Sequence, residues 1–382
     1  MLICNAHPRV DRRTRRQHRP NDGVDAMTGN RTSGTEWRYI ECFRQQFERC
    51  GLTAGETVTL LHESQSRPAL VETARLAAQS LGGRVIDLVV PTPGSSHPVP
   101  IRSTGASQAL AGHPVAVGAL AASDFVIDCT VEGLLHAPEL GAILTGGARV
   151  LMISNEHPEV FERLAWDADM PRRVDLGHQW LRSAAAMRVT SDAGTDLHIR
   201  LAGAFTAGST GLTAGRGSIA HWPGGLVLAF PAAHSVEGTL VLAAGDMNLT
   251  FNRVLENDVH LTIVDDHIES IEGHGADAVL FRTYLDAFGD RESLATSHVG
   301  WGMNPAARWD ASQLYDRRET WGTEARAYAG NFLYSTGANE TAGRFTAGHF
   351  DLPMRECTVR LDDRVVVERG VLIPELAPAE AP

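Results

Sequence analysis

The chain lacks the features that mark several classes of protein. Its five cysteines are odd in number, scattered and without a C-x-x-C pair, so we expect reduced thiols in the cytoplasm rather than a disulfide framework or a cysteine zinc site. No apolar run approaches the roughly 20 residues that span a bilayer, and we expect no transmembrane helix. Positive charge is scarce, since 34 Lys and Arg face 46 Asp and Glu and leave a net charge of -12. A nucleic-acid-binding protein would carry a basic footprint instead.

Common catalytic motifs are missing as well. No G-x-G-x-x-G follows any expected strand, and phosphate-loop and H-E-x-x-H patterns are absent, which argues against a dinucleotide site, a P-loop and a zincin. The serines lie outside any G-x-S-x-G nucleophile elbow. The composition, with 43% hydrophobic and 21% charged residues, is that of an ordinary globular protein.

The 382 residues suit two domains. Residues 1–35 are Arg-rich and polar without helical periodicity, and we expect a disordered leader. Residues 36–165 alternate apolar strand patterns with helical patterns, which predicts crossover units and a mainly parallel, three-layer α/β domain. The strands are expected at residues 57–64, 84–90, 124–131 and 148–156, and the helices at 37–50, 69–83, 107–123 and 138–147.

Residues 166–382 change in character. Alternating segments flank Asp192-Ala193-Gly194, a hairpin signal, and further short strands are separated by Gly, Asn and Asp. One helix is expected at residues 275–288. Asp265, Asp266 and Glu269 are expected at a solvated hairpin tip. The pattern predicts a C-terminal α+β domain, so the fold class is α/β overall.

The best candidate for chemistry is a His-x-Asp step, His349 and Asp351, with a second histidine, His298, upstream. In an extended segment, residues i and i+2 point to the same face, so His349 and Asp351 can hold one ion. Two imidazoles and one carboxylate are the protein ligands of the facial triad that binds non-haem Fe(II). The same His-x-acid spacing occurs at two other places in the chain, so the step alone is a weak signal.

His298 has an alternative interpretation, and two other places could contribute. His298 precedes a glycine-rich turn, which suits a ligand, although a structural histidine bonded to a carbonyl is the alternative. His221 lies before a Trp-Pro-Gly-Gly turn, where an acid or base role competes with simple packing. Leu134, Leu135 and His136 follow an expected strand, where open α/β sheets place ligand loops; the alternative is a plain helix entry.

Several motifs occur together in a specific order. They are LLHAPE, HWPGG, SVEGTLVLAAGD, SHVGWGMNPAARW, GNFLYSTGAN and GHFDLPMREC. In this order, from about residue 37 to about residue 370, the chain resembles the 2,5-dihydroxypyridine 5,6-dioxygenases. These are Fe(II) enzymes of nicotinate degradation that share ancestry with the aminopeptidase T metallopeptidases.

The resemblance implies specific roles. It assigns the metal triad to His298, His349 and Asp351 and the active-site histidine to His221. The segment 134–136 would form a lid supplied by a neighbouring subunit, which implies a homo-oligomer.

Two positions separate the dioxygenase and peptidase interpretations. Leu226 follows the Gly-Gly turn where the peptidases carry a metal-binding glutamate, and His298 replaces a second glutamate. Losing two carboxylates disfavours a pair of hydrolytic metals and suits one Fe(II). The dioxygenase family's own glutamate, twelve residues before His221, is Ser209 here. A hydroxyl cannot act as a general base near pH 7, so Ser209 would orient the substrate, and the substrate could be a different hydroxylated ring.

The resemblance therefore implies an enzyme that opens a hydroxylated pyridine with O2, the first candidate being 2,5-dihydroxypyridine, with N-formylmaleamate as product. Fe(II) is the expected cofactor, although Mn(II) would accept the same ligands, and no organic cofactor is needed. We expect no nucleic-acid or membrane partner. The alternatives are a metal-dependent aminopeptidase and a binding protein that kept the fold without the chemistry.

Overall fold

The computed structural model describes residues 34–94, 97–98, 107–164, 166–317 and 319–378. The predicted disordered leader, residues 1–35, lies almost wholly outside the described residues. Within these ranges, no helix has the length and apolar character needed to cross a membrane.

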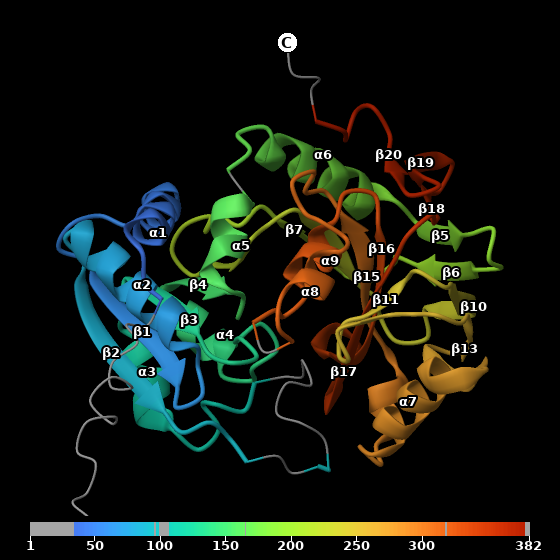
Figure 1. Cartoon of the computed structure of the whole chain (residues 1–382), viewed down its shortest axis with the longest axis horizontal. Coiled ribbons are helices and arrows are strands. Elements are labelled where there is room, and N and C mark those ends of the chain that lie inside the picture. The colour runs from blue at the N-terminus through green and yellow to red at the C-terminus, as the bar shows by residue number, and fades with distance from the viewer. Residues whose placement is uncertain (1–33, 95–96, 99–106, 165, 318, 379–382) are drawn as a thin grey trace, which may run out of the picture. The chain divides into compact units, whose positions relative to one another are not determined.

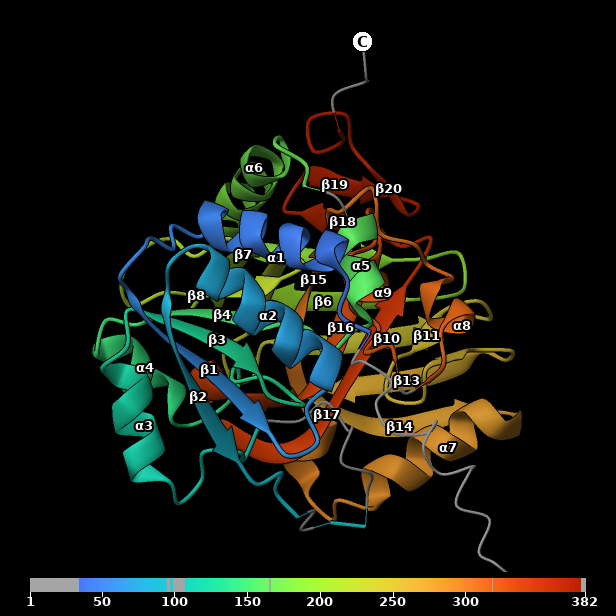
Figure 2. The same cartoon turned by 60° about the vertical axis from the view of Figure 1, so that its left-hand side comes forward.

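The first part of the chain alternates strands and helices. These are α1 (Trp37–Arg49), β1 (Thr57–Glu63), α2 (Pro68–Ser80), β2 (Arg84–Val90), α3 (Pro114–Ala121), β3 (Phe125–Cys129), α4 (Leu140–Thr145), β4 (Arg149–Ile153) and α5 (Pro158–Arg163). The four strands pair in parallel in the order β2-β1-β3-β4. Helices α1 and α2 pack on one face through Phe43, Phe47 and Ala74, and α3 and α4 pack on the other through Leu120 and Ile143 (Figures 1 and 2). The predicted three-layer parallel arrangement is confirmed.

A fifth strand reaches this sheet from much later in the chain. Strand β8 (Ile219–Trp222) pairs in parallel with β4, with Met152 opposite His221. Residues 219–222 fall within the predicted C-terminal domain, and their pairing with β4 was not predicted. The carboxyl ends of β4 and β8 lie side by side, at the edge where open α/β sheets bind ligands. The predicted division into residues 36–165 and 166–382 stays a prediction.

The rest of the chain forms antiparallel sheets with a few helices, which confirms the predicted α+β character. The larger sheet, in the order β14-β13-β10-β6-β5-β18-β19-β20, contains β5 (Ala186–Thr190), β6 (Asp196–Arg200), β10 (Val236–Leu242), β13 (Val259–Val264), β14 (His267–Gly273), β18 (Thr358–Leu361), β19 (Arg364–Glu368) and β20 (Val371–Leu372). The smaller sheet, in the order β17-β16-β15-β9-β7, contains β7 (Phe205–Ser209), β9 (Leu226–Phe230), β15 (Thr296–Gly302), β16 (Phe332–Asn339) and β17 (Arg344–Met354). The remaining elements are α6 (Met170–Ser183), β11 (Met247–Asn248), β12 (Arg253–Val254), α7 (Gly275–Asp286), η2 (Arg291–Leu294), α8 (Ala311–Leu314), α9 (Thr323–Ala327) and η3 (Glu340–Ala342).

One apolar core joins the two antiparallel sheets. Leu240 and Leu261 of the larger sheet, Trp301 and Phe350 of the smaller sheet, and Phe281 of α7 are buried together in it. The predicted hairpin at Asp192–Gly194 is also present, because β5 and β6 pair antiparallel on either side of it. Burying the inner faces of β15 and β17 in this core leaves their other faces free to carry polar side chains.

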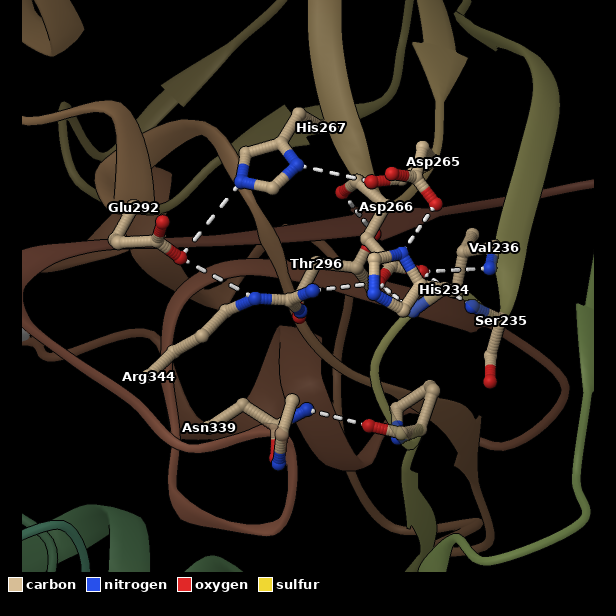
Figure 3. A network of polar contacts seen from close by, with 12 residues as sticks. His234, Ser235, Val236, Asp265, Asp266, His267, Glu292, Thr296, Asn339 and Arg344 are labelled. Atoms are coloured by element: carbon tan, nitrogen blue, oxygen red, sulfur yellow. Dashed lines mark hydrogen bonds and ion pairs between the residues drawn. The ribbon is translucent and has the colours of Figure 1, made fainter.

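A buried polar network lies at the hairpin between β13 and β14 (Figure 3). The predicted solvated tip is correct for Asp265, whose side chain is 59% exposed, and wrong for Asp266, which is fully buried. Asp266 accepts hydrogen bonds from the backbone N–H groups of residues 234–236 and from Arg344. Its own carbonyl accepts from Thr296 at the start of β15. The network therefore ties the beginnings of β15 and β17 to the larger sheet.

Candidate metal centre and its cavity

A cavity of about 500 Å³ lies beside the carboxyl ends of β4 and β8 and one face of the smaller sheet. Every side chain that the sequence predicts for the site lines it, except Leu134. The lining residues include Leu135, His136, Ser209, His221, Leu226, Leu228, Phe230, His298, Trp321, Arg326, Leu333, His349 and Asp351. The cavity is therefore walled by strands from two sheets and by the loop after β3.

Strand β17 presents its two candidate ligands as the spacing predicts. His349 and Asp351 face the cavity, whereas Phe350 between them is fully buried against Phe281 and Tyr284 on the core side. His298 lies on β15, two strands away across β16. The pairing of β15 with β16 is irregular between Thr296 and Val299, and such a bulge re-aims the side chains within it.

The three candidate ligands converge. His349 Nε2 lies 3.2 Å from Asp351 Oδ1, and His298 Nε2 lies 3.6 Å from the same oxygen. Ser335 of β16 sits between them, with its Oγ 3.0 Å from His298 Nε2 and donating to Asp351 Oδ1 at 2.5 Å. All four side chains are buried. Residues 51 positions apart in sequence thus share a volume small enough for one ion.

Hydroxyl groups lie beside both ring nitrogens of His298. Ser297 donates its hydroxyl proton to the Ala338 carbonyl at 2.5 Å, and its Oγ lies 3.2 Å from His298 Nδ1. Because that proton is already committed, Ser297 can accept from Nδ1–H, and Nε2, on the side of Ser335 and Asp351, would then offer its lone pair to a cation. Such an outer hydrogen bond orients histidine ligands in metal sites.

The charge states suit a cation. Burial would raise the pKa of Asp351, but Arg326 and the neighbouring imidazoles outweigh it and hold that pKa well below its usual range. Burial, opposed by Asp351 and helped by the nearby His349, lowers the pKa of His298 to about 3. At neutral pH the site therefore offers a carboxylate and a neutral imidazole, the forms that bind metals. These donors fit a divalent ion such as Fe(II) or Mn(II).

Arg326 is a site residue that sequence reasoning missed. Its Nε donates to Asp351 Oδ2 at 2.5 Å, its Nη1 donates to the Trp321 carbonyl at 2.7 Å, and its guanidinium lies over the Trp321 ring. Its buried Nη2 has no hydrogen-bond partner in the described part of the chain. No local pattern marks this arginine, because its partner Asp351 is 25 residues away on another element.

Two residues of the predicted lid segment, Leu135 and His136, line the cavity of their own chain. The ring of His136 lies 5.4 Å from that of His349 and 6.1 Å from that of His298, and ligand atoms of the three histidines lie within 4.8 Å of one another. Leu135 also lines the cavity, whereas Leu134 is fully buried in the core beneath α3 and α4. A lid from a neighbouring subunit stays a prediction.

Buried acids hold the loop that carries His136. Asp128 accepts from the N–H groups of Thr130 and Leu134, and Glu63 accepts from the N–H of Val131. The loop is thereby fastened to the ends of β1 and β3.

His221 and Ser209 form the wall near β8. His221 Nε2 lies 2.5 Å from Ser154 Oγ, just beyond the end of β4. Burial and the charge of Arg326, opposed by Asp351, lower the pKa of His221 to about 4, so the ring is neutral at pH 7. Ser209 donates weakly to the His221 carbonyl at 3.5 Å. Among the described residues, its hydroxyl forms no hydrogen bond with a titratable side chain.

The opposite wall is apolar. Leu226, Leu228 and Phe230 alternate along β9 toward the cavity, and Leu333 of β16 joins them in one cluster. The ring of Phe230 lies 5.1 Å from that of His298. A cavity with an apolar wall beside a metal-binding cluster suits a flat, partly apolar molecule with a few polar atoms.

Comparison with known proteins is consistent with this geometry. The sequence model of the family described as 2,5-dihydroxypyridine 5,6-dioxygenase matches residues 38–374. A curated 2,5-dihydroxypyridine 5,6-dioxygenase from Pseudomonas putida KT2440 is 38% identical over 327 residues, covering 84% of this chain and 92% of that protein. A solved structure of 2,5-dihydroxypyridine dioxygenase from the same strain has a TM-score of 0.83 at 35% identity and covers 89% of this chain and 98% of that one. Wild-type AmpT from Thermus thermophilus, with a TM-score of 0.57 at 15% identity over 88% of this chain and 99% of its own, shares the fold alone.

Proposed function

The chain belongs to the 2,5-dihydroxypyridine 5,6-dioxygenase family, and on that basis we propose that it is an Fe(II)-dependent dioxygenase that opens a hydroxylated pyridine ring. The first candidate substrate is 2,5-dihydroxypyridine, which would combine with O2 to give N-formylmaleamate, so that both oxygen atoms enter the product. The observation that carries the proposal is the convergence of His298, His349 and Asp351 on one point of a cavity with an apolar wall.

His298, His349 and Asp351 would hold the iron. When bound, Fe(II) supplies open positions for a ring oxygen and O2 and the redox chemistry that joins them. Arg326 keeps Asp351 ionised and oriented, and its free Nη2 is a donor for an oxygen of the ring. The positive charge of the Arg326 guanidinium favours an anionic oxygen substituent on the substrate.

The other residues would position the ring and move a proton. Phe230 and the leucines of β9 cover one face of the ring and exclude water. His221 is neutral and lines the same cavity, so it can exchange a proton with a ring substituent. Ser209 would orient the substrate as a neutral hydrogen-bonding group. The homo-oligomer and the cytoplasmic location stay predictions.

The direct test is anaerobic reconstitution of the full chain with Fe(II) or Mn(II), followed by oxygen uptake with a panel of di- and trihydroxypyridines. We expect uptake with 2,5-dihydroxypyridine or a close analogue and one O2 consumed per ring opened. No uptake above a metal-free sample, for any ring, would contradict the proposal.

Variants separate the proposal from its alternatives. His349→Ala should abolish iron retention and turnover together, and the exposed His260 on β13 offers the matched control His260→Ala, which should change neither. A metal-dependent aminopeptidase would instead release amino acids from peptides with Zn(II) or Co(II). A binding protein would retain the substrate without consuming oxygen. The family membership and Leu226 at the cavity wall favour the dioxygenase.

A further inference from the structure

A chain of two hydroxyl groups that do not line the cavity reaches His221. Ser154 follows β4, and its N–H donates to the Trp222 carbonyl, so the ends of β4 and β8 are held together. Ser154 Oγ lies 2.5 Å from His221 Nε2, and it accepts a hydrogen bond from Thr323 Oγ1 at 2.8 Å. Ser154 is fully buried and Thr323 is 1% exposed.

The direction of these bonds can be assigned by counting protons. A serine hydroxyl has one proton to donate. Thr323 is the donor in its bond to Ser154. Apart from Thr323, the described residues offer Ser154 Oγ one partner, His221 Nε2. If Nε2 carried a proton, the buried Ser154 proton would have no acceptor, at a cost of about 1–3 kcal/mol. The Ser154 proton therefore points at an unprotonated Nε2.

Thr323 is itself fixed from the first sheet. It is the first residue of α9, and its N–H donates to Glu156 Oε1 at 2.8 Å. Glu156 is 1% exposed and also accepts from the N–H of Trp321 at 2.8 Å. The donor that orients Ser154 is thus built into the same segment that carries Trp321 and Arg326 to the cavity.

From this arrangement we infer that Ser154 and Thr323 are positioning residues that hold His221 in the Nδ1–H tautomer, so that its Nδ1–H faces the substrate as a proton donor. His221 lines the cavity, and its Nδ1 has no hydrogen-bond partner among the described residues. The role toward a substrate rests on the proposed function, whereas the tautomer itself does not. The low pKa of His221, about 4 because of burial and Arg326, agrees with a single ring proton at neutral pH.

The assignment gives the hydrogen bond to the ring a direction. A neutral Nδ1–H can donate to an oxygen or nitrogen of the bound ring, and it cannot accept a proton at that atom. The bond stabilises negative charge on the ring while the proton stays on Nδ1, so neither an imidazolate nor an alkoxide needs to form. His221 would thus serve first as a hydrogen-bond donor to the ring rather than as the base of the first step.

The first measurement reads the tautomer without turnover. The full chain is labelled with 15N-histidine, loaded with diamagnetic Zn(II), and its ring nitrogens are assigned by the loss of signals in His221→Gln. We expect an unprotonated Nε2 and a protonated Nδ1 for His221 between pH 6 and 8. A protonated Nε2 in the wild-type protein would overturn the inference, whatever the enzyme's activity.

The second measurement removes the orienting groups. In Ser154→Ala the hydrogen bond to Nε2 is lost, so the Nε2–H form should appear beside the Nδ1–H form and kcat should fall by at least about tenfold, because a wrong tautomer removes much of what acid–base catalysis contributes. Ser154→Thr should restore both readouts. In Thr323→Val the Ser154 proton still has only Nε2 as its acceptor, so the Nδ1–H form should persist, but the Nε2 signal should shift because the bond from Ser154 loses the donor that orients and polarises it. Thr323→Ser should restore the wild-type signal.

A matched pair of hydroxyls provides the control. Ser123 and Thr59 form a buried hydroxyl pair with 2.6 Å between their oxygens, distant in sequence from the site residues. Ser123→Ala should leave the His221 spectrum and kcat unchanged. An unchanged His221 spectrum in Thr323→Val would refute the role of Thr323. Should the chain lack dioxygenase activity but show the Nδ1–H form, only the proposed function would fail.

Discussion

Strand β17 ends in one buried aspartate–arginine pair and begins in another, and the two are built differently. At its start, Arg344 contacts Asp266, whose two carboxylate oxygens also accept three backbone N–H groups (Figure 3). Near its end, Asp351 contacts Arg326 and Ser335 through side chains only. The first carboxylate is saturated with donors. The second lies beside two imidazoles and keeps room for a cation.

This difference separates structural from functional burial of charge. A buried carboxylate costs less when backbone dipoles surround it, and such a group orders the fold. A carboxylate held by side chains leaves partners incompletely satisfied, as the free Nη2 of Arg326 shows among the described residues. Incomplete satisfaction of this kind is expected where a ligand completes the set.

The largest contrast is expected from the two aspartates. Asp351→Asn should abolish iron retention and oxygen uptake, because the amide replaces an anionic ligand, and it should lower the unfolding midpoint less than Asp266→Asn, which also weakens the acceptor of three backbone N–H groups. Asp266→Asn should lower the midpoint and leave iron binding in the folded protein intact. Metal analysis after gel filtration and urea unfolding measure both. Wild-type iron content in Asp351→Asn would remove Asp351 from the ligand set.

The arginine at the structural end should matter mainly for stability. Arg344→Ala leaves the Asp266 charge buried without its cation, and breaking a buried pair costs about 3–5 kcal/mol. Because three backbone N–H groups remain, we expect the lower end of that range. Arg188→Ala, which breaks an exposed pair with Asp196 on β5 and β6, should cost much less, because solvent screens an exposed ion pair. Equal losses in the two variants would contradict a structural role for the network.

Arg326, the arginine near Asp351, should matter more for metal affinity and activity than for stability. Arg326→Gln removes the group that orients Asp351, and loss of such an outer contact typically reduces metal affinity or activity about 10–100-fold. Competition with a chelator measures the affinity, and oxygen uptake measures the activity. We expect a smaller change in unfolding free energy than in Arg344→Ala. If Arg326→Gln lost stability but kept its iron affinity, the Asp351–Arg326 pair would have the same structural role as the Asp266–Arg344 pair.

The same two pairs show what could be predicted from sequence. The spacing of two between His349 and Asp351 predicts that both lie on one face of a strand, as they do in β17, and their role as metal ligands stays a prediction. Periodicity likewise predicted the parallel sheet. Asp266 was predicted at a solvated tip, since nothing local shows that Arg344, 78 residues away, would cover it. Arg326 and Ser154 were missed for the same reason. Strand β8 has four residues and no distinctive pattern, so its place beside β4 follows only from the tertiary structure.

The smallest effect is expected in the pH dependence of the unfolding free energy, through Asp266 of the Asp266–Arg344 pair. Burial would raise the pKa of Asp266, but the hydrogen bonds from Arg344 and the backbone outweigh it, and its pKa lies below the usual value. A carboxyl whose pKa is lower in the folded state than in the unfolded state stabilises the fold above its unfolded pKa of about 3.9, and this contribution is lost as pH falls through the folded pKa. The difference in unfolding free energy between the wild type and Asp266→Asn should therefore be constant from pH 7 to about pH 5 and shrink below about pH 4. Urea unfolding at a series of pH values measures it. A difference that grows on acidification would mean that Asp266 is protonated in the folded protein, and the contrast with Asp351 would then rest on charge rather than on saturation of the carboxylate.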